Sequence, residues 1–111
     1  MQYHTKTLSE KEILKLFDIE EDHFNDYKSK DISGKGFSKI ISAFGNASGG
    51  EIYLGIREEK DTKIKHWEGF PDIESSNNFL QILDSLPQVE DFYDIDYLKH
   101  PTLNTYVLKV S

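Results

Sequence analysis

Apolar residues recur along the chain at two spacings, one typical of helices and the other of strands. Three of them share the i, i+3, i+4 spacing of an amphipathic helix: Ile13, Leu16 and Phe17. Ser9 precedes this segment and Glu12 follows three residues later, which is the spacing of a capping box. The pattern therefore predicts a short helix over residues 10–18.

Two later segments carry the longer i, i+3, i+4, i+7 stripe of a helix that packs on a sheet. The first stripe consists of Phe37, Ile40, Ile41 and Phe44. The second consists of Phe79, Ile82, Leu83 and Leu86. Residues 29–36, rich in Gly, Ser and Lys, predict a loop before the first helix. Pro87 ends the second helix because proline cannot donate the next helical hydrogen bond.

Alternation of apolar and polar residues predicts five strands. They span residues 23–28, 51–56, 63–68, 92–98 and 105–109. In the strongest of them, Ile52, Leu54 and Ile56 share one face. We expect that face to lie on the core.

A polar hairpin over residues 57–62 leads into the third of these strands. Ile64 and His66 alternate with more polar neighbours and so share one face. His66 is therefore interpreted as a hydrogen-bonded core residue. The four histidines show no metal-ligand spacing.

The order of these elements predicts the fold class. Helices and strands follow one another without strict β-α-β alternation, so we expect an α+β fold with a two-layer mixed β-sheet and two or three helices. A length of 111 residues allows a single domain. The predicted core consists of Phe37, Ile40, Phe44, Ile52, Leu54, Ile56, Phe79, Leu83 and Leu86. We expect residues 1–111, with an N-terminal helix within 1–18, to be the first part of a longer protein, because the last strand runs almost to the end.

The composition excludes several classes of protein. The chain has no cysteine, which excludes disulfides and thiolate metal sites. Its apolar runs are too short for a membrane span and its N-terminus lacks a signal-peptide pattern, so we expect a cytoplasmic protein with no membrane partner. The net charge of −7 argues against a uniformly basic surface for nucleic acid, but it allows a local basic groove.

Carboxylates flank the start of the first predicted strand. Asp26 and Lys28 are two residues apart and share a face of that strand, and Glu21 precedes them. Oxygen ligands so placed hold a divalent cation, while the lysine meets a phosphate or the attacking water. The alternative is a solvated acidic turn, which is the more common setting for carboxylates.

A glycine-containing loop over residues 46–50 separates a helix from a strand. Gly49 and Gly50 allow a ligand to approach the backbone closely and expose N–H groups to an anion, and Asn46 begins the same loop. The alternative is a tight turn that needs glycine for a positive φ.

Four lysines lie in a short segment of this acidic chain: Lys28, Lys30, Lys35 and Lys39. Asp31 is the only acidic residue between them. The pattern is consistent with a phosphate-binding rim and equally with a solubilising loop.

Three stretches of the chain resemble the Schlafen-type AlbA_2 domain family. They are Glu21 with the later string DYKS at 26–29, IISAFGNASGG at 40–50 and EIYLGI at 51–56. The corresponding family patterns are E-x4-[ED]-[FY]-K, I-S-A-F-A-N-T-x-G-G and a strand ending in G-V. The match is most specific in Ser-Ala-Phe-x-Asn-x-x-Gly-Gly, and it extends over about residues 18–111.

The resemblance implies a mixed α+β fold and nucleic-acid binding. Some members of the family are metal-dependent endoribonucleases that act on structured RNA such as tRNA through three carboxylates. Others are DNA- or nucleotide-binding modules. By position, the first two acidic residues fall on Glu21 and Asp26 and the motif lysine on Lys28. The third falls on Glu58, with Glu59 as the second choice, and Mg²⁺ or Mn²⁺ is the implied cofactor.

Three functional hypotheses follow. In the first, Glu21, Asp26 and Glu58 hold the metal ion of a ribonuclease, and Lys28 orients the phosphate or stabilises the developing charge. In the second, the lysines and the glycine loop bind nucleic acid or a nucleotide without cleaving it. In the third, the acidic surface recruits a protein. RNA is favoured over DNA as the partner, and we expect a homodimer or a further C-terminal domain to complete the groove.

Overall fold

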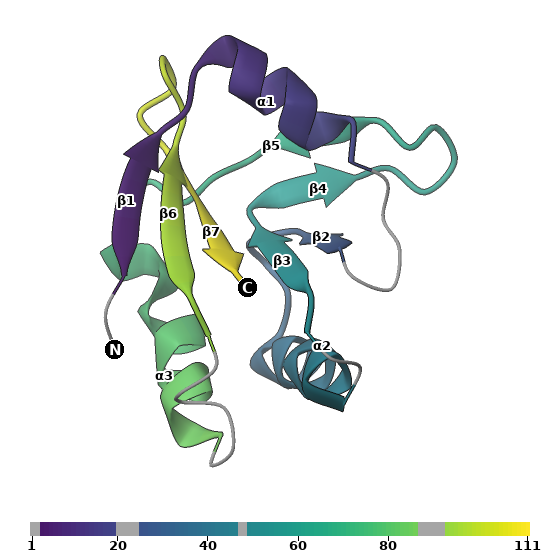
Figure 1. Cartoon of the computed structure of the whole chain (residues 1–111), viewed down its shortest axis with the longest axis vertical. Coiled ribbons are helices and arrows are strands. Elements are labelled where there is room, and N and C mark those ends of the chain that lie inside the picture. The colour runs from purple at the N-terminus through teal and green to yellow at the C-terminus, as the bar shows by residue number, and fades with distance from the viewer. Residues whose placement is uncertain (1–2, 20–24, 47–48, 87–92) are drawn as a thin grey trace.

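A five-stranded mixed β-sheet organises the protein (Figure 1). The computed structural model describes residues 3–19, 25–46, 49–86 and 93–111. In spatial order, the strands are β1 (His4–Thr7), β6 (Ile95–Lys99), β7 (Tyr106–Val110), β3 (Glu51–Leu54) and β2 (Asn25–Lys28). β1 is parallel to β6 and β2 is parallel to β3, whereas β7 is antiparallel to both β6 and β3. β1 and β2 therefore form the two edges of the sheet.

Helices α2 (Gly34–Asn46) and α3 (Asn77–Ser85) cover one face of this sheet. A short 3-10 turn, η1 (Glu74–Ser76), leads into α3. Apolar side chains of both helices pack with alternate residues of the central strands. The buried residues of this main core are Phe37, Ile41, Ile52, Leu54, Phe70, Phe79, Leu83, Ile95, Tyr97, Leu108 and Val110.

Helix α1 (Glu10–Phe17) lies over the opposite face, together with a two-stranded antiparallel sheet of β4 (Ile56–Glu58) and β5 (Lys65–Trp67). The buried residues of this second core are Leu8, Ile13, Leu16, Tyr27, Tyr53, Ile56, Leu98 and Val107. The α+β class and the mixed sheet with three helices confirm the fold predicted from the sequence.

The capping box predicted before α1 is formed. The backbone N–H of Glu12 donates to the Ser9 hydroxyl, and the backbone N–H of Ser9 donates to the Glu12 carboxylate, both at 3.1 Å. These bonds satisfy donors that a helix N-terminus otherwise leaves unpaired. Ile13 and Leu16 of this helix are buried, as the spacing predicted.

Most of the predicted core is also confirmed. The fully or almost fully buried members are Phe37, Ile52, Leu54, Ile56, Phe79 and Leu83. Ile40, Phe44 and Leu86 are only partly buried and pack at the margin of the main core. On α2 it is Ile41, 1% exposed, and not Ile40, that points into the core.

The predicted strand over residues 51–56 is wrong at its end, because Gly55 interrupts it. Gly55 has φ +106°, a left-handed value that favours glycine, and a Cβ there would lie 3.3 Å from the backbone of Gly69. Ile56 therefore belongs to β4 and to the second core, whereas Ile52 and Leu54 belong to the main core.

The interpretation of His66 as a core residue is wrong. His66 and Ile64 are substantially exposed, and the buried partner on this strand is the Lys65 side chain. The hairpin is also shorter than predicted, because Arg57 and Glu58 pair within β4. Alternation alone could not show which face of β5 is covered, since a lysine is buried only where it finds charged and carbonyl partners.

Other predicted boundaries shift by a few residues, and one strand was not predicted. α2 begins at Gly34, inside the predicted loop, where the Ser33 hydroxyl accepts a hydrogen bond from the Gly36 N–H at 3.0 Å. β1 has no apolar alternation because all four of its residues are exposed. Within the described ranges, no helix is both long and apolar enough to cross a membrane.

Gly49 and Gly50 are required for different reasons. Gly49 has φ +108° with open space around it, whereas a Cβ on Gly50 would lie 2.9 Å from the ring of Phe44. We expect Gly49→Ala to lower the free energy of unfolding by about 1–2 kcal/mol, since an L residue is strained at that φ. Urea denaturation measures the change, with the exposed Ser42→Ala as the control. Equal stability of Gly49→Ala and the parent would contradict the backbone requirement.

Candidate nucleic-acid interface

Strand β2 places Asp26 and Lys28 at one edge of the sheet. Asp26 is in register with Ile52 and Lys28 with Leu54, so both side chains lie on the face covered by α2. The Lys28 ammonium is 3.3 Å from Asp26 Oδ1, and the Lys28 side chain is 37% exposed. Asp26 is the more enclosed of the two, and its Oδ1 is buried without a hydrogen bond.

A second carboxylate, Glu68, links Arg57 to the backbone of Lys30 at this edge, and the Lys30 ammonium itself lies 3.5 Å from Asp31. Glu68 accepts a hydrogen bond from the backbone N–H of Lys30 at 3.3 Å, and its other oxygen lies 3.8 Å from Nε of Arg57. The Lys30 and Arg57 side chains are 38% and 48% exposed. We call Lys28, Lys30 and Arg57 the basic edge.

Sequence reasoning grouped Lys28 and Lys30 of the basic edge but did not place Arg57 with them. Arg57 follows the interruption at Gly55, and the hydrogen bond of the Gly55 N–H to the carbonyl of Lys28, at 2.8 Å, fixes β4 beside the end of β2. The sequence held one signal for this arrangement: Gly55, which can end a strand, is followed two residues later by Arg57. It could not show the direction in which the chain continues.

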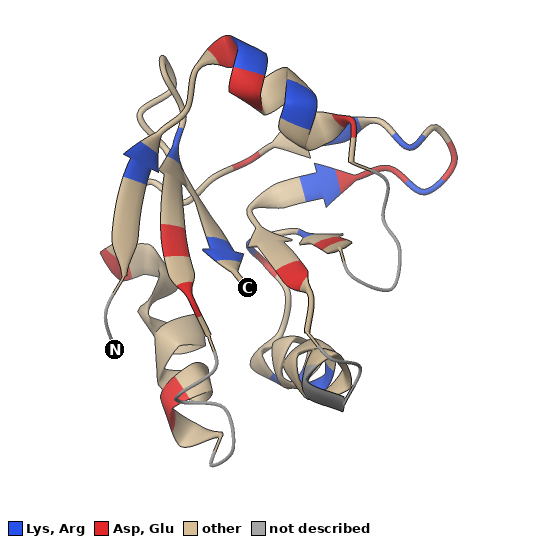
Figure 2. Ribbon diagram, viewed as in Figure 1, with Lys and Arg blue, Asp and Glu red and all other residues tan. Residues whose placement is uncertain are grey.

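The remaining lysines lie on α2. Lys35 and Lys39 are both exposed and are four residues apart, which places them on one side of the helix. Figure 2 shows basic residues on α2 and on β4. Asn46 ends α2, and its side chain lies outside the described part of the structure.

Glu58, the first choice for a third carboxylate, lies in a different environment. It pairs with the Lys65 ammonium at 3.3 Å, and both side chains are buried, at 9% and 8% exposed. The same ammonium donates to the carbonyl of Phe17 at 2.7 Å and lies 4.9 Å from the ring centroid of Tyr27. Tyr27 alternates with Asp26 along β2, so Asp26 and Glu58 point to opposite faces of the sheet.

Glu59, the second choice, is a surface residue of the hairpin. Its carboxylate accepts a hydrogen bond from Thr62 and lies 2.8 Å from Nε2 of His66. The hydrogen bond from Thr62, followed by that from His66, holds the pKa of the Glu59 carboxyl below its ordinary value. These contacts tie Glu59 to the hairpin.

Two members of the predicted metal triad, Asp26 and Glu58, are described by the structure, and they do not lie together. The third, Glu21, lies outside the described residues. Asp26 and Glu58 each have a lysine as counter-ion. Among the described residues, no group of three His, Asp or Glu side chains could hold a metal ion. The described donors therefore fit Mg²⁺ or Mn²⁺ poorly, and Glu21 as a ligand stays a prediction.

The protein is therefore a small α+β domain that carries the basic edge although its net charge is negative. The chain belongs to the Schlafen AlbA_2 family, because the family model described as "Schlafen, AlbA_2" matches residues 21–111. The family assigned by resemblance to the sequence is thereby confirmed. No curated protein and no solved structure matches the chain.

Proposed function

We propose that the protein is a nucleic-acid-binding module whose basic edge contacts backbone phosphates. The observation that carries the proposal is that Arg57 of β4 is held beside the segment of Lys28 and Lys30, which places three cations from two segments at one edge of the sheet. Membership of the Schlafen AlbA_2 family supports it, because nucleic-acid binding is associated with that family.

The chemistry of the basic edge suits phosphate. Lysine offers a point charge and arginine a planar fork of donors, and both neutralise phosphates on binding nucleic acid. Their partners include Asp26 for Lys28, Asp31 for Lys30 and Glu68 for Arg57, and a phosphate can replace these carboxylates as counter-ion. Partial exposure of all three cations leaves them accessible to a ligand of this size.

Removing one cation tests the proposal. We expect Arg57→Gln to weaken binding of a labelled single-stranded RNA about threefold to tenfold at low salt, and to reduce the slope of log K against log salt by about one. Lys11→Gln on α1 is the matched control, since it removes the same charge from an exposed site outside the basic edge.

Fluorescence anisotropy at several salt concentrations measures both quantities, with tRNA and duplex DNA as parallel ligands. Tighter binding of tRNA or of the single strand than of duplex DNA would support RNA as the partner. Equal effects of Arg57→Gln and Lys11→Gln would show that RNA affinity depends only on the net charge of the protein, and would overturn the proposal.

A metal-dependent endoribonuclease is the second candidate, and the observation that favours it is the buried carboxylate of Asp26. Asp26 Oδ1 is buried without a hydrogen bond and has the Lys28 ammonium at 3.3 Å, so a divalent cation would have to compete with that lysine for the carboxylate. A nuclease of this kind would also need the two other carboxylates close to Asp26. Glu58 points to the opposite face and is held by Lys65, so binding without cleavage is the better supported function.

A thermal melt distinguishes the two candidates. We expect millimolar Mn²⁺ to leave the melting temperature unchanged, because Asp26 and Glu58 already have ammonium partners and do not form one site. A ligand that binds only the folded state would raise the melting temperature. A rise that is lost in Asp26→Asn, together with EDTA-sensitive cleavage of tRNA, would establish the nuclease instead.

A further inference from the structure

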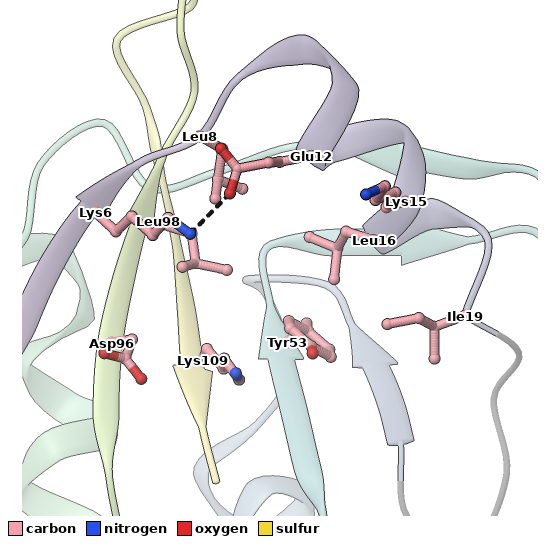
Figure 3. A pocket seen from close by; sticks show the side chains of 10 residues that line it. All are labelled: Lys6, Leu8, Glu12, Lys15, Leu16, Ile19, Tyr53, Asp96, Leu98 and Lys109. Carbon is pink, nitrogen blue, oxygen red and sulfur yellow. Dashed lines mark ion pairs between the residues drawn. The ribbon is translucent and has the colours of Figure 1, made fainter.

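A pocket of about 390 Å³ lies between α1 and the sheet, on the side of the second core (Figure 3). We call it the α1 pocket. Its lining residues are Lys6, Leu8, Glu12, Lys15, Leu16, Ile19, Tyr53, Asp96, Leu98 and Lys109. The lining residues from Lys6 to Ile19 precede residues 21–111, which match the family model. The part of the pocket that they form therefore lies outside the matched region. The proposed binding of nucleic acid does not use the pocket.

One side of the α1 pocket is apolar. Leu16 and Ile19 reach down from the α1 segment toward Tyr53 of β3 (Figure 3). Leu8 and Leu98 add further aliphatic surface. A volume within the range of small-molecule sites and a lining that is largely hydrocarbon suit a ligand with an aliphatic body.

The charged groups of the α1 pocket differ in how fully they are paired. Lys6 is 2.7 Å from Glu12, and Lys109 is 3.5 Å from Glu51. Lys6 holds the pKa of the Glu12 carboxyl below its ordinary value, in keeping with a formed pair. Among the residues that the structure describes, Lys15 has no ion pair or side-chain hydrogen bond and lines the pocket.

We propose that the α1 pocket binds an aliphatic carboxylate, with its hydrocarbon chain on the apolar side and its head group at Lys15. Hydrocarbon burial supplies the affinity, and the ammonium supplies the preference for an anion. The lysines Lys6 and Lys109 are balanced by Glu12 and Glu51, and Asp96 places a further carboxylate on the β6 side. The preference for an anion therefore comes from Lys15, which places the head group at the α1 side of the pocket. Inorganic phosphate has no hydrocarbon chain that could cover the apolar side of the pocket.

A fluorescence titration with 8-anilinonaphthalene-1-sulfonate, an amphipathic anion, tests the site on the full chain. We expect one dye to bind per chain, and Lys15→Gln to raise its dissociation constant about two- to fivefold. Lys11→Gln lies on the same helix, is exposed and does not line the pocket, so it should leave binding unchanged. Equal constants for the two variants would overturn the proposal.

Competition identifies the ligand class. Octanoate should displace the dye, whereas inorganic phosphate and the neutral detergent octyl glucoside should not at the same concentration. Displacement by phosphate would make the pocket a simple anion site, and displacement by octyl glucoside a simple apolar one. Adenosine monophosphate displacing the dye better than octanoate would show that the body is aromatic. Each of these three results would overturn the assignment.

Discussion

Replacing Ile41 with alanine should lower the free energy of unfolding by about 3–4 kcal/mol. Ile41 is 1% exposed and lies in the main core between α2 and the sheet. The substitution removes the contacts of the isoleucine side chain and leaves a cavity that a packed interior fills only in part. Urea denaturation monitored by circular dichroism measures the loss.

The adjacent residue supplies the control. Ile40 undergoes the same chemical change in Ile40→Ala, but it is only partly buried at the margin of the same core. We expect that variant to lose about 1 kcal/mol, in proportion to the smaller apolar area it removes from water. Equal losses at the two positions would mean that α2 is rotated about its axis relative to the structure described above.

The second large effect is expected at the ion pair between Glu58 and Lys65. Lys65→Met should cost about 3–5 kcal/mol, because it leaves the Glu58 carboxylate buried without its counter-ion. It also removes the hydrogen bond from the ammonium to the carbonyl of Phe17 at the end of α1. Amide hydrogen exchange should therefore rise in α1 more than in α3.

The double variant Glu58→Leu with Lys65→Met shows what the single variant measures. Replacing both partners removes the unpaired charge, so most of the lost stability should return. The remaining deficit should be about 1 kcal/mol, the net value of the missing hydrogen bond to Phe17. A double variant as unstable as Lys65→Met would show that packing around the lysine stem, and not charge, holds this region together.

The three helices could be predicted from the sequence because their apolar stripes are local. Spacing alone identified the faces of α1, α2 and α3, and the capping box located the start of α1. The choice of Ile41 over Ile40 could not be made in this way, since both fit the stripe. It depends on how α2 lies against a sheet whose strands come from other parts of the chain.

The two faces of the β4–β5 hairpin could not be predicted, because they depend on distant partners. Lys65 is buried only because the carbonyl of Phe17 and the ring of Tyr27 are brought to it by the fold. A pattern of hydrophobic residues assigns such a lysine to solvent. The prediction chose Ile64 and His66 as the inward side chains for that reason.

The candidate site was predicted where it is continuous in sequence. Lys28 and Lys30 lie in one lysine-rich segment, whose pattern fits a phosphate-binding rim and a solubilising loop equally. Arg57 joins them through Glu68, and neither residue is near that segment in the chain. A tertiary bridge of this kind has no local signature.

The pairing of β1 with β6 constrains the order in which the protein assembles. His4 of β1 is in register with Asp96 of β6, so this contact closes a loop that contains every element between the two strands. Closing so long a loop is slow, and it cannot occur until β6 has left the ribosome. Until then, the segment that carries α1 lacks part of its docking surface, because Leu98 of β6 and Val107 of β7 belong to the second core. A nascent chain that stops before β6 should leave part of the apolar stripe of α1 exposed, which makes that stage open to aggregation or to capture by a chaperone.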